Sequence, residues 1–137
     1  MTERTTAPEA EHHKPVAIQL HRRSRMLELE YAGGERYMLS CEYLRVHSPS
    51  AEVLGHGPGQ EVLQTGKMHV AIDAIKPVGN YALQLVFDDG HDTGLYSWTY
   101  LHELCREQDA KWRDYLDRLA AAGAYRDPDV QVVKIQL

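Results

Sequence analysis

The segment LRVHSPSAEVLGHGPGQ (44–60) holds the densest group of residues that could do chemistry. It contains two histidines, two serines, two prolines and three glycines. Glycine and proline at this density indicate irregular backbone, and a long loop inside a compact domain is often functional. The composition leaves three interpretations open: a phosphate-binding loop, a metal site, or a plain connection between two elements.

Phosphate binding is the interpretation that the spacing disfavours. A P-loop needs G-x-x-x-x-G-K-[ST], and a dinucleotide loop needs G-x-G-x-x-G between a strand and a helix. Residues 55–60 read GHGPGQ, and Pro58 has no amide hydrogen to offer a phosphate. The residues that follow are typical of a strand, so no helix N-terminus would face an anion there. We therefore predict no cofactor-binding residue in this loop.

Metal binding has no local signature in this sequence. Non-haem iron oxygenases use two histidines and one carboxylate, commonly as H-x-D or H-x-E, and none of the eight histidines has an acid two residues later. A structural zinc site needs about four cysteine or histidine ligands, whereas Cys41 and Cys105 lie far apart in the chain. A site assembled from distant histidines stays open but unspecific; the candidates are His47, His56, His69 and His91.

Covalent catalysis lacks a pattern as well. The sequence has no G-x-S-x-G nucleophile elbow. It does not place a histidine beside Cys41 or Cys105. Two cysteines far apart in a sequence usually stay reduced in a reducing compartment and are buried as small hydrophobic residues. We therefore predict no catalytic residue and no enzyme activity.

The composition of the whole chain limits its class. With 137 residues, 43% of them hydrophobic, the chain is long enough for one domain with its own core. The net charge of −5 disfavours nucleic acid and anionic membranes as partners. The N-terminus is polar, and no apolar run approaches the roughly 20 residues of a membrane span. We expect a cytoplasmic protein that binds neither nucleic acid nor membranes.

The first half of the chain shows a strand pattern. Residues 1–14 have no periodicity, and we expect them to form a disordered tail. Ser40 is placed to cap a short helix over 41–47, because its hydroxyl can accept from the free amides of the first turn. Alternating apolar residues predict an antiparallel meander of three strands, at 16–20, 26–31 and 36–40.

The second half adds strands and then helices. Strands are predicted at 68–78, 81–87 and 91–96, followed by a helical segment over about 98–122 that Ser97 caps. A polar patch predicts a break near Gln108, and Gly123 is suited to end the helix. The order predicts an α+β fold over 15–123, with small antiparallel β-sheets, a short helix and a C-terminal helical segment in a single domain. Residues 124–137 form a C-terminal extension with a β-like run.

Two segments together resemble a known family. These are EYLRVHSPSAEVLGHG (42–57) and VGNYALQLVFDDGHDTGLYSWTYLHEL (78–104). The order of a strand, GNYA, a second strand, DGH, and YSW opening a helix is similar to the gamma-butyrobetaine hydroxylase-like N-terminal domain family. The resemblance covers roughly residues 15–123 and implies a small free-standing bacterial member. It also implies a small α+β fold and, in the eukaryotic hydroxylases, a bound zinc.

The resemblance places that zinc site in the opening loop. The family's three cysteine ligands follow a Leu-Arg pair, here Leu44–Arg45, and fall on Ser48, Ser50 and Val53, while its histidine ligand falls on His91. Serine is a poor zinc ligand and valine cannot coordinate. We therefore expect no cofactor and a degenerate zinc loop. Hydrogen bonds from the two serines and the histidine, with apolar packing of the valine, should hold the loop instead.

The resemblance also suggests a role. The catalytic jelly-roll domain of the hydroxylases, with its iron triad, has no counterpart in this sequence. We expect a non-enzymatic accessory or interaction domain, connected to iron or iron–sulfur metabolism, that binds a protein partner or associates with itself. The alternative is a metal-binding protein that holds iron or zinc through His91 and neighbouring loop histidines.

Overall fold

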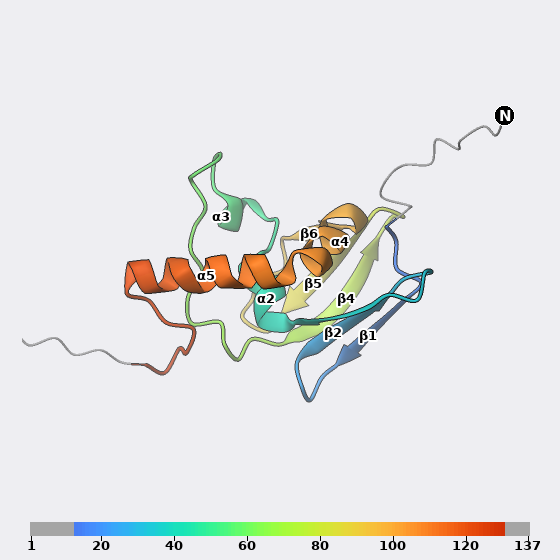
Figure 1. Cartoon of the computed structure of the whole chain (residues 1–137), viewed down its shortest axis with the longest axis horizontal. Helices are drawn as coiled ribbons and strands as arrows, with labels where there is room; N and C mark the ends of the chain where they lie inside the picture. Colours follow the sequence, from blue (N-terminus) through green and yellow to red (C-terminus); the bar gives the residue numbers. More distant parts are fainter. Residues whose placement is uncertain (1–12, 131–137) are drawn as a thin grey trace, which may run out of the picture.

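The computed structural model describes residues 13–130 and shows two small antiparallel sheets with helices packed against them (Figure 1). This confirms the α+β fold and the single compact domain expected from the sequence. The predicted disordered tail lies almost wholly outside the described residues, as does most of the predicted C-terminal β-like run. None of the described helices is long and apolar enough to cross a bilayer.

The first sheet is the predicted meander, in the order β1-β2-β3. It consists of β1 (Ala17–His21), β2 (Met26–Glu30) and β3 (Arg36–Ser40). Because side chains alternate between the faces of a strand, β2 buries Leu27 and Leu29 completely on one face. Glu28 and Glu30 lie on the other face, where Arg36 pairs with both. The sequence placed each strand to within a residue.

The second sheet has the order β4-β5-β6 and differs more from expectation. It consists of β4 (Ile72–Val78), β5 (Ala82–Phe87) and β6 (Leu95–Ser97). The predicted start of the first strand at residue 68 is wrong, because Met68 N donates to Arg126 O outside the sheet. Of the predicted strand over 91–96, only the last two residues belong to a strand. Residues 91–94 form a loop, with the His91 side chain turned into the interior.

Serine caps open two of the helices, as predicted. Ser40 Oγ accepts from Tyr43 N at 2.9 Å at the start of α2 (Cys41–Val46). Ser97 Oγ accepts from Tyr100 N at 3.1 Å at the start of α4 (Trp98–Arg106). The chain breaks at Glu107 and continues as α5 (Gln108–Ala122), which ends at Gly123 with a φ of 64°. The predicted break and end of the helical segment are therefore confirmed.

The short helix α3 (Ala51–Leu54) was not predicted. It lies inside the glycine- and proline-rich loop that the sequence indicated as irregular. Four residues are too few to show an apolar period of 3.6 residues. A helix this short therefore leaves no readable pattern in the sequence.

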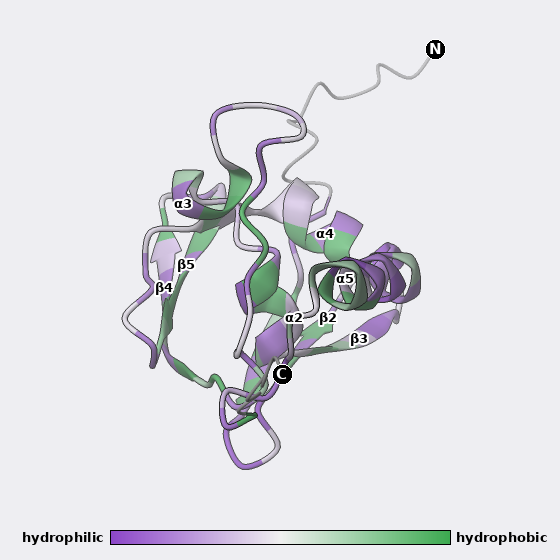
Figure 2. Ribbon diagram, turned by 90° about the vertical axis from the view of Figure 1, so that its left-hand side faces the viewer, coloured by the Kyte–Doolittle hydropathy of each residue, from purple (hydrophilic) through white to green (hydrophobic). Residues whose placement is uncertain are grey.

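The core lies between the two sheets and α4, and α2 lies within it. All six residues of α2 are buried. In Figure 2, α2 lies between the second sheet and α5, which is seen end-on. Tyr96 of β6 is fully buried and its hydroxyl donates to Leu44 O of α2 at 2.5 Å. This bond supplies a partner to a helix carbonyl that water does not reach.

The Tyr96 bond can be tested by removing its oxygen. The Tyr96→Phe variant should lose about 1–3 kcal/mol of unfolding free energy in urea, because Leu44 O is left buried without a donor. The matched control is Tyr81→Phe, since Tyr81 is 54% exposed; it should change stability by less than about 0.5 kcal/mol. Equal stabilities of the two variants would contradict the importance of this bond.

Candidate functional site: the loop after α2 and His91

The structure brings the predicted loop serines to His91. Ser48 Oγ lies 2.8 Å from His91 Nε2, and Ser50 Oγ lies 3.4 Å from the same nitrogen. Ser48, Ser50, Val53 and His91 are all buried. The hydrogen bonds expected from the two serines and the histidine are thus confirmed, and so is the burial of the valine.

The Ser48–His91 contact is a direct hydrogen bond. Two ligands of one tetrahedral zinc would lie about 3.5 Å apart, because each sits about 2.0–2.3 Å from the ion. The observed 2.8 Å is shorter than that separation. Gly94 packs against Ser48 so closely that a Cβ there would collide with Ser48 Oγ. The two segments therefore fit tightly around the hydroxyl and the imidazole.

An ionic group, of which Arg45 is the buried member, lies beside His91. Asp89 Oδ1 accepts from His91 N at 3.2 Å, and Asp89 Oδ2 accepts from Arg45 Nε at 2.8 Å and from Lys67 Nζ at 2.6 Å. Burial tends to raise the pKa of Asp89, but the bonds from Lys67 and Arg45 outweigh it and lower the pKa. Burial, and then the charge of Arg45, lower the pKa of His91. His91 is therefore a neutral imidazole near pH 7.

Sequence reasoning missed this ionic group. Arg45 is only 7% exposed, and its Nη1 is buried with no hydrogen-bond partner among the described residues. The sequence offered one sign of this group, which is that Arg45 lies between apolar residues on a short predicted helix. Its partner Asp89 lies 44 positions further along the chain, so no local pattern could connect the two.

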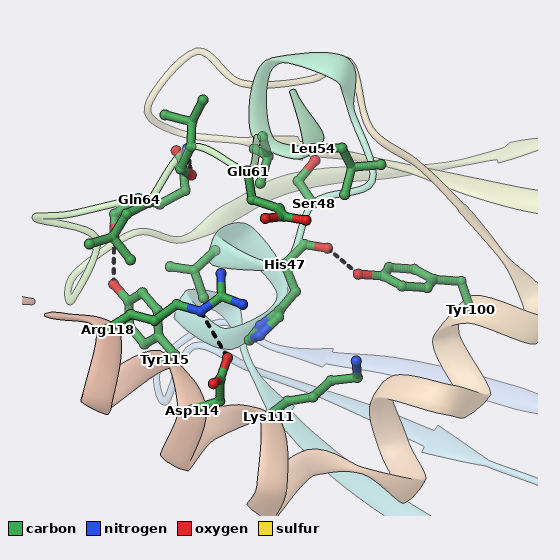
Figure 3. Close-up of a pocket in the computed structure, with 14 residues that line it drawn as sticks. His47, Ser48, Leu54, Glu61, Gln64, Tyr100, Lys111, Asp114, Tyr115 and Arg118 are labelled. Atoms are coloured by element: carbon green, nitrogen blue, oxygen red, sulfur yellow. Dashed lines mark hydrogen bonds and ion pairs between the residues drawn. The ribbon is translucent and has the colours of Figure 1, made fainter. Parts of the chain in front are cut away.

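A cleft of about 300 Å³ opens between α5 and the loop that follows α2 (Figure 3). His47 lies in it, and its Nδ1–H donates to Tyr43 O at 2.9 Å. Tyr115 OH donates to Gln64 O at 2.8 Å and so holds the far side of the loop. The cleft combines an apolar floor with charged groups on α5; the lining includes Val46, Val53, Leu63, Lys111, Asp114 and Arg118.

The remaining candidates do not converge with His91. His56 and His69 are exposed on loops. Among residues 13–130, one group of three possible metal ligands has its ligand atoms within 4.8 Å of one another, and it joins His69 to Asp127 and Asp129. Both cysteines are buried, as expected, and burial raises the pKa of Cys105 to about 12. These thiols are therefore protonated and poor nucleophiles.

These features define a class: a small α+β domain whose central loop is held by a buried serine–histidine contact and by an ionic group beside it. The family described as "Gamma-butyrobetaine hydroxylase-like, N-terminal" matches residues 18–102. The chain belongs to this family. A search of curated proteins gave no match.

Three solved structures are similar to the described fold. Two are NMR solution structures, at 55% and 51% identity, with TM-scores of 0.75 and 0.73. The first alignment covers 90% of this chain and 97% of the other, and the second covers 100% and 99%. The third is a crystal structure of a protein of unknown function in the DUF971 family, from Acidithiobacillus ferrooxidans. It is 39% identical, with a TM-score of 0.56, and covers 68% of this chain and 93% of its own.

The half-buried His47 should make stability depend on pH. Burial lowers its pKa, and the charges of Lys111 and Arg118 add to this, while the bond to Tyr43 O opposes it. When the pH falls below about 6.5, the unfolded imidazole takes up a proton before the folded one does. Stability should therefore fall as the pH drops from 7 to 5.

The His47→Asn variant tests this dependence, because its amide can still donate to Tyr43 O but cannot titrate. Urea unfolding at pH 7, 6 and 5 should show a shallower loss of stability in the variant. The difference in slope cannot exceed about 1.4 kcal/mol per pH unit for one proton. Parallel curves for the two proteins would show that His47 does not contribute.

Proposed function

We propose that this protein is a non-enzymatic accessory domain that works by binding another protein. The observation that carries the proposal is the Ser48–His91 hydrogen bond at the position where the family resemblance implies zinc. Serine, serine and valine offer no thiolate at the three cysteine positions, so the loop serves as a scaffold. The resemblance to a domain that accompanies hydroxylases and iron–sulfur cluster carriers suggests a partner in iron or iron–sulfur metabolism.

The surface we assign to the partner is the rim of the cleft. Leu54 and Val62 line it and are 46% and 53% exposed. Exposed apolar side chains around a hollow, with charged neighbours, are typical of a protein interaction site. The loop bonds to His91 hold one wall of this surface in place.

Partner capture from native cells tests this surface. The wild-type chain should retain a consistent partner, and the Leu54→Asp/Val62→Asp variant should lose most of it, because charges oppose burial of an apolar interface. The control is Val16→Asp, an apolar residue that is 63% exposed and outside the cleft lining. Light scattering of the purified chain reports self-association. A monomer without a partner, or equal capture by both variants, would contradict the proposal.

The degenerate zinc loop can be tested by restoring its ligands. The variant Ser48→Cys/Ser50→Cys/Val53→Cys should bind one Co²⁺ or Zn²⁺ per chain, because three thiolates and His91 would complete a tetrahedral set. Thiolate-to-cobalt charge-transfer absorption detects such a site and ignores sites made only of nitrogen and oxygen. Adding His91→Ala to the variant should weaken cobalt binding at least about tenfold. Failure to bind cobalt would show that these positions do not correspond to the family's ligands.

The alternative is a metal-binding function. It is supported by the convergence of His69, Asp127 and Asp129 among the described residues. The group includes His69, which is one of the four candidate histidines in the sequence, but it does not include His91. A metal function of this chain would therefore use different residues from the family's zinc loop.

A further inference from the structure

We propose that a divalent metal ion binds between the loop before β4 and the C-terminal segment, held by His69, Asp127 and Asp129. One nitrogen of the imidazole and one oxygen of each carboxylate all lie within 4.8 Å of one another. Atoms that share an ion at about 2.1 Å are at most about 4.2 Å apart. A closure of about half an ångström is within reach of these side chains, because two of them are exposed and can change rotamer.

Contacts outside the group place the two segments side by side. Gly66 N donates to Tyr125 O at 2.9 Å, and Met68 N donates to Arg126 O at 3.0 Å. Arg126 also forms two hydrogen bonds to the buried carboxylate of Glu42, at 2.8 and 2.7 Å. Backbone pairing and the Arg126–Glu42 ion pair thus hold the histidine opposite the two aspartates.

The charge of the group favours a cation. Within residues 13–130, neither Asp127 nor Asp129 forms an ion pair, and no ion pair joins His69 to either of them. Asp127 Oδ1 accepts from Asp129 N at 2.8 Å, which fixes one carboxylate while its other oxygen remains available. Two carboxylates that face an imidazole without a compensating cation attract a divalent ion.

The donor set limits the choice of metal. Two carboxylate oxygens and one imidazole nitrogen suit Mn²⁺, Fe²⁺ and Zn²⁺, whereas Cu⁺ prefers thiolates and Ca²⁺ prefers oxygen alone. Three protein ligands leave the other positions to water at this exposed site. An ion here would fasten the C-terminal segment to the domain. It shares no residue with the Ser48–His91 loop, so its presence and the interaction function can be tested separately.

The experiment titrates Mn²⁺ and Zn²⁺ into the untagged full-length chain and follows heat and the Mn²⁺ electron paramagnetic resonance signal. We expect one ion per chain with an affinity that falls at least about tenfold in His69→Ala and in Asp129→Asn. The matched control is His56→Ala, also an exposed loop histidine. It should keep the wild-type affinity at this site.

A second readout separates this site from ions held by other histidines. The bound ion should slow hydrogen exchange at the amides of Gly66 and Met68 in the wild type and not in His69→Ala, because it links their segment to the C-terminal one. Equal binding by wild type, His69→Ala and Asp129→Asn would overturn the proposal and indicate adventitious metal only. Absence of Mn²⁺ and Zn²⁺ binding to the wild type would overturn it as well.

Discussion

The burial of α2 is the constraint on which the rest of the structure depends. A helix leaves its last carbonyls without intrahelical partners, and because α2 is buried these carbonyls need donors from the protein. Tyr96 OH donates to Leu44 O, and Tyr100 OH donates to His47 O at 2.6 Å. Tyr43 of α2 in turn donates to Leu104 O at 2.7 Å. Tyrosine hydroxyls from β6 and α4 therefore determine where these elements lie against α2.

The same contacts set the geometry of the candidate site. α2 leads directly into the segment with Ser48, and the chain between β5 and Tyr96 carries His91. The Tyr96 bond to α2 and the Ser48–His91 bond therefore join the same two segments at two points. These bonds join protein groups directly, so they hold the loop in position. Any partner that binds the cleft rim would meet a wall that is already ordered, which lowers the entropic cost of binding.

Local signals in the sequence predicted the helices and strands well. Contacts between residues far apart in the chain could not be predicted from such signals. The alternation around Leu27, the caps Ser40 and Ser97 and the left-handed Gly123 are all encoded within a few residues, and each was confirmed. The pairing of Ser48 with His91 was accessible only through the family resemblance. The Arg45–Asp89 ion pair and the convergence of His69 with the C-terminal segment depend on tertiary contacts, which no local pattern reports.

The two candidate metal positions, at His91 and at His69, differ in the charges around them as well as in their possible ligands. Near His91, Arg45 and Lys67 both donate to one oxygen of Asp89, so two cations face a single carboxylate. Burial is the largest cause that lowers the pKa of His91; the charge of Arg45 comes next, and Glu52 and Asp89 oppose it. Burial thus disfavours a charge on this imidazole, and a divalent ion would meet the same cost of desolvation there. At His69 the balance differs, because neither Asp127 nor Asp129 forms an ion pair within the described part of the chain. The proposed ion would therefore meet two carboxylates at His69, next to the C-terminal segment.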